Sequence, residues 1–242
     1  MDCPMGEEKL EIPVGSLGFI TPFRVLVAGS SSCGKSELIA RMLENKETFF
    51  PDTVFDFAYY FHPPNSMTPE RNAYYRRLTA SIQGMECVEG LPNIADLTDL
   101  PGKKLLIIDD LYDKAVNSEQ MQELMVVHSH HSDISLFFTS QNYFNQGRFS
   151  KTFLRNYTDT ILFDAKTERL VLEIISRQLF PGANRFLPRA MEWLRENEPC
   201  VFDRYIWIDS NPQNALPEKL RVRTRVIPDR SEEITFQIVI IP

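Results

Sequence analysis

The sequence predicts an α/β fold in which a mainly parallel central sheet is flanked by helices. Short apolar runs alternate along the chain with segments of helical periodicity, a pattern typical of strand–helix–strand units. A glycine-containing turn at residues 29–34 joins the first apolar run to an amphipathic segment. From Cys200 onward the pattern changes to short alternating segments, which predict a β-rich C-terminal extension of the same sheet.

The strands are predicted from apolar runs that are bounded by polar turn residues. In chain order they lie at Phe23–Ala28, Val54–Phe61, Lys104–Asp109, Ile134–Ser140 and Thr160–Phe163. The extension adds the segments Arg204–Asp209, Lys219–Val226 and Glu233–Ile241, with a loop at Asn211–Pro217 between the first two.

The helices are predicted from apolar residues that recur three and four positions apart. Thr68 is expected to cap a helix that has Pro69 at its first position, and Asn117 or Ser118 is expected to cap a later one. The predicted helices cover Ser36–Lys46, Pro69–Ile82, the segment after Ser118, Thr167–Arg177 and Arg185–Asn197.

Composition indicates an ordinary globular protein of one large domain. The 242 residues are 43% hydrophobic and 24% charged, and no apolar stretch approaches the ~18–20 residues that span a bilayer. The net charge of −7 argues against a protein coated in positive charge for nucleic acid, although a local basic stripe remains compatible with it.

The chain has no visible signal for secretion or lipidation. Its acidic N-terminus lacks an apolar core, and Asp2 stands where myristoylation needs glycine. Its 4 cysteines are scattered without metal-site or disulfide spacing, which favours a reducing compartment. We therefore expect an intracellular protein that is not secreted.

The segment GSSSCGKS matches the phosphate-loop pattern G-x-x-x-x-G-K-[ST] and lies between a predicted strand and a predicted helix. Backbone N–H groups of such a loop and the positive end of the helix dipole together bind phosphate. Lys35 is expected to reach the β- and γ-phosphates, and Ser36 to bind Mg²⁺. The predicted nucleotide-binding residues are Gly29, Ser30, Ser31, Ser32, Cys33, Gly34, Lys35 and Ser36.

Two carboxylates end the predicted strand KKLLIIDD, at the edge of an open α/β sheet where ligands bind. Asp109 is expected to hold Mg²⁺, and Asp110 to act as the general base that polarises the attacking water. The alternative for Asp110 is that it only starts the following turn. Gln141, which follows the strand FFTS with Asn142 behind it, is the candidate sensor of the γ-phosphate, against the alternative of turn chemistry.

A long segment containing the strand Val54–Phe61 separates the phosphate loop from these carboxylates. It is typical of the P-loop class that has an extra sheet strand between the two elements. Because no [NT]-K-x-D sequence is present, ATP is the expected nucleotide. Residues 1–22 are expected to form an N-terminal extension, and residues 23–242 one P-loop ATPase domain whose β-rich part begins near residue 200.

Two other functions fit a phosphate loop. A nucleotide or small-molecule kinase needs an arginine-rich lid and an acceptor pocket, for which the β-rich C-terminus offers no clear candidate. An AAA+ protein remodeller normally ends in a small helical lid, whereas this chain ends in predicted strands.

Five segments together resemble one family: GSSSCGKS, EGLP, LLIIDDLYD, HSHHSDISLFFTSQNYF and RVRTRVIPD. They are similar to those of the DNA-packaging ATPases of Polinton/Maverick elements, adintoviruses and related viruses. These belong to the FtsK–HerA superfamily, which includes the poxvirus packaging ATPase. The resemblance extends from about Phe23 to Asp229. The sequence departs from the family's pattern around Leu154 and Asn156, which do not follow the usual Leu-Asn order.

The resemblance implies a RecA-like core, a ring of identical subunits, and ATP-driven movement of double-stranded DNA into a preformed capsid. Capsid proteins are then expected partners, and the host nucleus, a cytoplasmic viral factory or the virion the expected location. Ring ATPases of this kind complete each site with an arginine from the neighbouring subunit. Arg148 and Arg155, which follow the sensor strand, are the candidates, with simple surface charge as the alternative.

Three further groups of polar residues have open roles. Lys219, Arg221, Arg223 and Arg225 alternate along one segment, which indicates either a DNA or subunit contact or a charged edge strand. The cations Arg71, Arg76 and Arg77 are interpreted as a solvated helix face. The run His128–His131 is interpreted as a helix end and not as a metal site, because no ligands stand at suitable spacing.

Overall fold

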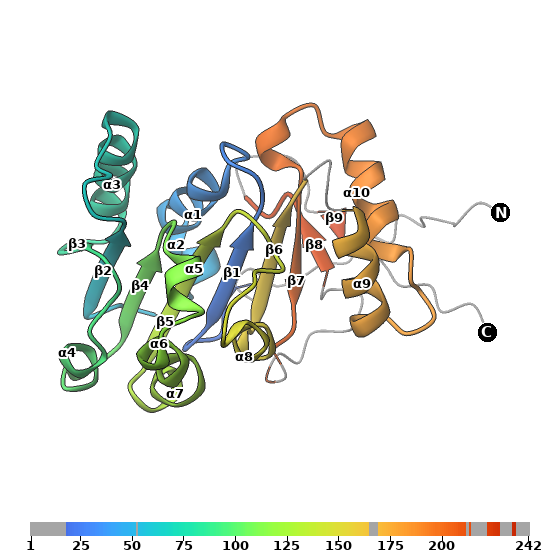
Figure 1. Ribbon diagram of the computed structural model, residues 1–242. Coiled ribbons are helices and arrows are strands. Elements are labelled where there is room, and N and C mark those ends of the chain that lie inside the picture. The colour runs from blue at the N-terminus through green and yellow to red at the C-terminus, as the bar shows by residue number, and fades with distance from the viewer. Residues whose placement is uncertain are drawn as a thin grey trace.

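The computed structural model describes residues 18–51, 53–164, 169–211, 213, 222–227 and 234–235. Several predicted parts of the chain lie outside these residues. They are most of the N-terminal extension, the start of the helix predicted from Thr167, most of the last predicted strand, and the cations Lys219 and Arg221. Over the described part, one sheet has the order β3-β2-β4-β5-β1-β6-β7-β8-β9 (Figure 1).

The six strands from β3 to β6 in this order are parallel, and the last three add to the sheet in antiparallel pairs. This arrangement confirms the predicted fold class, including the β-rich C-terminal extension. The strands are β1 (Arg24–Ala28), β2 (Phe57–His62), β3 (Glu86–Glu89), β4 (Lys104–Ile108), β5 (Ile134–Ser140), β6 (Asp159–Phe163), β7 (Tyr205–Asp209), β8 (Val222–Thr224) and β9 (Ile234–Thr235).

The helices also follow the predicted pattern, with added short elements in the connections. Thr68 and Ser118 cap α3 and α6 as expected, since their hydroxyls accept the N–H groups of Arg71 and Met121. The helices are α1 (Lys35–Glu44), α2 (Lys46–Phe49), α3 (Pro69–Ser81), α4 (Ile94–Thr98), α5 (Tyr112–Ala115), α6 (Glu119–Glu123), the π-helix η1 (Leu124–His128), α7 (Ser129–His131), α8 (Ser150–Asn156), α9 (Arg169–Leu179), α10 (Phe186–Asn197) and the 3₁₀ turn η2 (Val201–Asp203).

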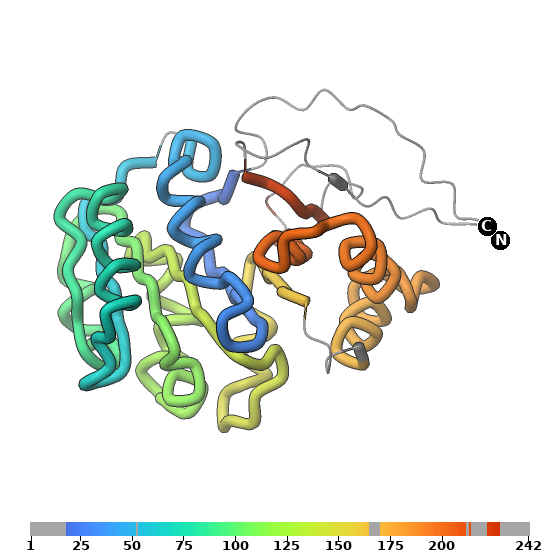
Figure 2. The backbone as a smooth tube through the Cα atoms, turned by 90° about the horizontal axis from the view of Figure 1, so that it is seen from above, coloured from blue at the N-terminus to red at the C-terminus, as the bar shows by residue number. Residues whose placement is uncertain are grey.

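Helices cover both faces of the sheet. Alternate residues of each strand point to opposite faces, and both sets are apolar, so each face packs against helices. In β1, Val25 and Val27 pack in one core with α1 and α3. Leu26 and Ala28 pack in the other, with the helices that follow β4 and β6. Figure 2 shows α1 and α3 side by side on one face. A central sheet buried on both faces explains why its strands read as continuous apolar runs.

The strand order positions three strand ends beside one another. β5 lies between β1, which leads into the phosphate loop, and β4, which leads into Asp109. In sequence, β2 lies between β1 and β4. In the sheet, however, β2 pairs with the side of β4 that faces away from β5. This is the arrangement expected of a RecA-like core, and it brings the loop and the carboxylates to one edge.

One of the C-terminal cations, Arg223, has neither of the two roles considered for it. Arg223 is fully buried in β8, where its guanidinium lies 2.7 Å from Asp209 and 4.4 Å from the centre of the Trp207 ring. Burial, followed by the charge of Asp209, raises the pKa of the neighbouring Asp159 to about 7. Arg223 therefore compensates buried acids, and β8 is an inner strand between β7 and β9. Arg225 pairs with Glu198 at 2.7 Å.

The histidine run lies at a helix end, as predicted: His128 ends η1, and His130 and His131 occupy α7. In the described part of the chain, no group of three His, Cys, Asp or Glu side chains could hold a metal ion. No helix found there has the length and apolarity to cross a membrane.

Candidate active site

The phosphate loop, residues 29–36, begins where β1 ends. The Gly29 N–H donates to the Ser140 carbonyl at 3.1 Å, which ties the loop to the end of β5. Gly34, with φ of +113°, precedes α1, and a Cβ there would lie 3.2 Å from both Phe163 and Phe202. A side chain at position 34 would therefore be strained by conformation and by contact, so glycine is needed.

The loop side chains divide between solvent and core. Lys35 begins α1, and its ammonium donates to the carbonyls of Gly29 and Ser30 at 2.6 and 2.8 Å. The ammonium thus lies over the loop, where phosphates would enter. Ser30, Ser31 and Ser32 are exposed, Ser36 is half-buried, and Cys33 is buried. The structure brings all eight predicted residues together at the N-terminus of a ten-residue helix.

Asp109 is a nearly buried carboxylate at the end of β4, with 7% of its surface exposed. The Thr139 hydroxyl donates to one of its oxygens at 2.7 Å, and the Tyr60 hydroxyl donates to the other at 2.9 Å. Burial and the neighbouring carboxylate raise the pKa of Tyr60 above its usual range, so this phenol remains a donor. The two hydrogen bonds fix the orientation of the carboxylate.

Asp110, the second residue after β4, has a left-handed backbone, with φ of +58°. Its N–H donates to the Thr139 hydroxyl at 2.9 Å, so one threonine links both acids to β5. The Asp110 side chain is 53% exposed. Aspartate tolerates this backbone better than most residues, and the exposed carboxylate is open to water at the same edge as the phosphate loop.

Arg71 is part of this site, which corrects its interpretation as one of three cations on a solvated helix face. Its guanidinium, 18% exposed, lies 3.4 Å from Asp109 and 3.8 Å from Asp110. It also donates to the Ser66 carbonyl at 3.0 Å, just before α3. Arg77 of the same helix pairs with Glu37 and Glu44 of α1, whereas Arg76 is exposed.

Gln141 and Asn142 follow β5 directly and are exposed. Since β5 lies between β1 and β4, Gln141 stands between the loop and the carboxylates along the edge of the sheet. The Ser140 hydroxyl donates to the Asn142 carbonyl at 2.6 Å and accepts from the Asn145 amide at 2.9 Å. These contacts shape a turn after the strand.

The two candidate arginines lie apart. Arg148 is exposed on the segment after the β5 turn and pairs with Glu119 at 2.7 Å. Arg155 is exposed on α8, next to Asn156, whose carbonyl accepts from Arg24 at the start of β1. Arg155 therefore lies at the amino-terminal edge of the sheet, opposite the phosphate loop. The expectation that both lie on the edge of the nucleotide site is wrong for Arg155.

Sequence reasoning missed three residues of this site: Tyr60, Arg71 and Thr139. Of the three, only Thr139 could have been suspected from the sequence, because it lies near the end of β5, just before the predicted sensor Gln141. Tyr60 and Arg71 contact Asp109 across 49 and 38 positions of the chain. Contacts at such separations leave no local pattern.

No protein-family model and no curated protein matches this chain. Among solved structures, it is similar to the genome packaging NTPase B204 from Sulfolobus turreted icosahedral virus 2. For the complex with sulfate, the identity is 12% over 92% of this chain and 99% of that chain, with a TM-score of 0.49. For the complex with AMP, the identity is 14% over 79% of this chain and 94% of that chain, with a TM-score of 0.48. The chain is also similar to the ATPase EscN from the enteropathogenic E. coli type III secretion system. There the identity is 11% over 66% of this chain and 45% of that chain, with a TM-score of 0.38. Because these values are low, the interpretation of the site depends on the chain's own residues.

Proposed function

We propose that this chain hydrolyses ATP and uses the energy to move double-stranded DNA into a viral capsid. The observation that carries the ATPase part is the placement of the phosphate loop and the pair Asp109–Asp110 at one edge of the sheet, joined through β5. A phosphate site beside one buried and one exposed carboxylate has the groups that nucleotide hydrolysis needs.

The residues fit a nucleotide with Mg²⁺. Lys35 already lies against the loop carbonyls, so it can exchange these acceptors for phosphate oxygens without a long movement. Ser36 and Asp109 would hold Mg²⁺, since hydroxyl and carboxylate oxygens are its preferred ligands. When bound, Mg²⁺ offsets the negative charge that builds on the phosphates. Thr139 and Tyr60 hold Asp109 in a fixed orientation toward this edge.

Asp110 and Gln141 would act on the attacking water. The exposed Asp110 carboxylate can accept a proton from water, and Gln141, on the strand end between Asp110 and the loop, can orient that water. A cation from a neighbouring subunit would complete the site, and Arg148 is the candidate for it, since Arg155 lies at the opposite edge of the sheet. Arg148 would first have to leave Glu119, an exchange that exposed ion pairs allow at small cost.

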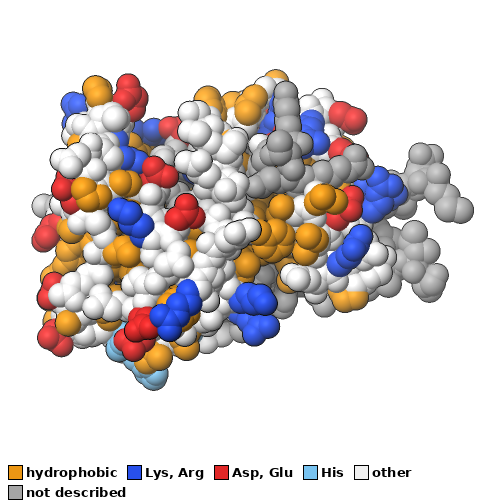
Figure 3. Space-filling model, in the orientation of Figure 1, with side chains coloured by type: hydrophobic (Ala, Val, Ile, Leu, Met, Phe, Trp, Pro, Cys, Tyr) orange, Lys and Arg blue, Asp and Glu red, His pale blue; other side chains and the backbone are white. Residues whose placement is uncertain are grey.

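The DNA, ring and capsid parts of the proposal are supported by the resemblance of the five sequence segments to packaging ATPases. On the face drawn in Figure 3, Lys and Arg side chains lie among Asp and Glu side chains. Such a mixed surface does not attract DNA broadly. A ring can still do so, because its channel gathers a few cations from every subunit around one duplex.

The test is ATP turnover by the purified chain with and without double-stranded DNA. We expect release of inorganic phosphate, stimulated by DNA. Asp110→Asn is expected to keep ATP binding but lower kcat about 100-fold or more, because it removes the proton acceptor. Lys35→Ala is expected to lose both binding and turnover.

Asp113→Asn is the matched control, since Asp113 is an exposed acid on α5 outside the site. Loss of ATP binding in Asp110→Asn would remove the general-base assignment. Transfer of phosphate to a nucleoside monophosphate, with little hydrolysis, would replace the ATPase by a kinase. Turnover that ignores double-stranded DNA would contradict the packaging role.

A further inference from the structure

Two apolar side chains are exposed beside the phosphate loop. Val201 and Phe202, in η2, are 53% and 51% exposed. A Cβ placed on Gly34 would lie 3.2 Å from Cα and Cβ of Phe202, so η2 contacts the loop itself. Figures 1 and 2 both show the orange segment that contains η2 next to the blue α1. Exposed apolar surface at a ligand site is usually covered when the ligand binds.

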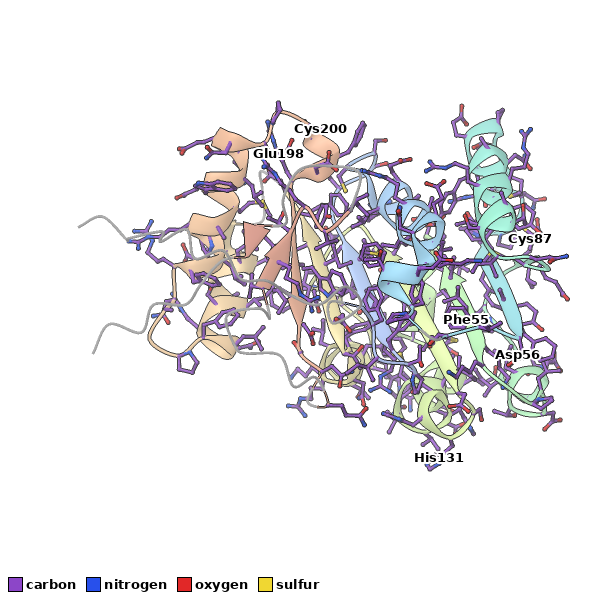
Figure 4. The ribbon with its side chains drawn as sticks, turned by 180° about the vertical axis from the view of Figure 1, so that it is seen from behind. Phe55, Asp56, Cys87, His131, Glu198 and Cys200 are labelled. Carbon is purple, nitrogen blue, oxygen red and sulfur yellow. The ribbon has the colours of Figure 1, made fainter. Side chains whose placement is uncertain are left out.

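This segment is held firmly in place. Asp203 pairs with Arg41 of α1 at 3.2 Å, with both side chains almost buried. The Asp164 N–H, just after β6, donates to the Arg204 carbonyl at 2.8 Å. Glu198 and Cys200 precede η2 at the same edge of the sheet (Figure 4), and the Cys200 N–H donates to the Glu198 carboxylate at 3.0 Å. The exposed side chains therefore stand on a fixed support.

The order of the strands indicates which end of a nucleotide would lie there. Asp109 and Asp110 follow β4, on one side of the phosphate loop, and mark where metal and terminal phosphate would bind. η2 leads into β7, on the opposite side of the loop. A triphosphate in the loop with its γ-phosphate toward the acids therefore directs its ribose and base toward η2.

We propose that Phe202, with Val201 beside it, is the platform on which the purine base of the bound nucleotide stacks. The proposal rests on the proposed function, because it requires a nucleotide in the phosphate loop. An aromatic ring fixed beside the loop is suited to this role, since base–aromatic stacking needs no reorganisation of a rigid support. Stacking would place the base over a surface that is otherwise exposed to water.

The experiment compares two ligands that share the phosphates and differ in the base. Binding of ATP and of inorganic tripolyphosphate, each with Mg²⁺, is measured by calorimetry for the full chain and for Phe202→Ala. We expect the variant to bind ATP about 10-fold more weakly and tripolyphosphate as the unchanged chain does. Phe202→Trp is expected to keep ATP affinity and to show quenching of its added fluorescence by ATP but not by tripolyphosphate.

Phe144→Ala is the matched control, because Phe144 is the other exposed phenylalanine among the described residues, 40% exposed, and follows β5 on the acid side of the loop. Its ratio of ATP to tripolyphosphate affinity should equal that of the unchanged chain. If Phe202→Ala does not fold, Phe202→Leu keeps the apolar bulk and should still lose ATP affinity.

The outcomes separate this proposal from the proposed function. If the unchanged chain binds neither ligand, the nucleotide site itself is refuted. If it binds both, and the Phe202 variants weaken both equally or neither, the platform is overturned while the nucleotide site stands. Weakening of ATP alone supports the platform.

Discussion

Each oxygen of the Asp109 carboxylate is held by a residue from a distant element. Thr139 donates to one oxygen and also accepts the Asp110 N–H, so the two acids depend on one hydroxyl of β5. Tyr60 and Arg71 approach the other oxygen. Arg71 is therefore the residue whose charge competes most directly with a metal ion at Asp109.

Arg71→Ala is expected to lower the Mg²⁺ concentration that half-saturates nucleotide binding. Removal of a cation 3.4 Å from Asp109 leaves the carboxylate more attractive to Mg²⁺. An ion pair of this kind contributes up to ~1 kcal/mol, which corresponds to at most about a five-fold change. Titration of Mg²⁺ at a fixed ATP concentration measures this half-saturating Mg²⁺ concentration in the variant and in the unchanged chain.

Arg76→Ala is the control for this measurement, because Arg76 is an exposed cation on the same helix. The same Mg²⁺ requirement in both variants would show that Arg71 exerts no local charge effect on the site.

Among the elements, α1 connects the phosphate loop to two others. Arg77 of α3 pairs with Glu37 and Glu44 of α1, at partly exposed positions. Arg41 of α1 pairs with Asp203 of η2 at an almost buried position. Buried pairs that lose one partner leave an uncompensated charge, whereas exposed pairs contribute little. The link from α1 to η2 is therefore the more sensitive of the two.

Arg41→Met is expected to lower the free energy of unfolding by about 3 kcal/mol, because it leaves Asp203 buried without this partner. Adding Asp203→Leu should recover part of the loss, since the buried carboxylate that had lost its Arg41 partner is then gone. Urea unfolding of the two variants measures both values. A single variant as stable as the unchanged chain would show that the pair does not hold η2.

For the whole molecule, the arrangement of subunits decides whether the site is complete. Arg148 is exposed on the segment between β5 and α8 and pairs with Glu119, whereas Arg155 lies at the amino-terminal edge of the sheet, opposite the phosphate loop. In a ring of subunits with the same orientation, nucleotide sites all lie at one height, so we expect Arg148 to reach the neighbouring site more easily than Arg155.

The prediction is that Lys35→Ala and Arg148→Ala are each inactive alone, and that an equal mixture regains turnover. In a randomly mixed ring, about a quarter of the interfaces combine an intact Lys35 with an intact Arg148 from the neighbour. Turnover and assembly mass are measured in the same samples, with and without ATP and DNA. Arg155→Ala is mixed in the same way.

Lys151→Ala, an exposed cation of α8, is the control for these mixtures. Full activity of both arginine variants alone would exclude a trans-acting role for either residue. A mass equal to one subunit during turnover would contradict the ring.

The parts of the site that could be predicted are contiguous in the chain. The phosphate loop needs glycine, lysine and serine at fixed spacing, since one turn and one helix end build it. Asp109 could be predicted because a buried strand ends there. For Arg223, the interpretation from its alternation with apolar residues is wrong, because period two assigns a face but does not say whether that face is covered. Asp209 and Trp207 cover it.

By itself, the sequence determined the fold class, the phosphate loop and the two acids that follow a buried strand, because local spacing and periodicity encode all three. The tertiary structure decided that Thr139 joins both acids, that Arg71 faces them, and that Phe202 lies against Gly34. These contacts come from strand order, which brings residues far apart in the chain to one edge of the sheet. Strand order depends on packing of the whole sheet, and no short segment records it.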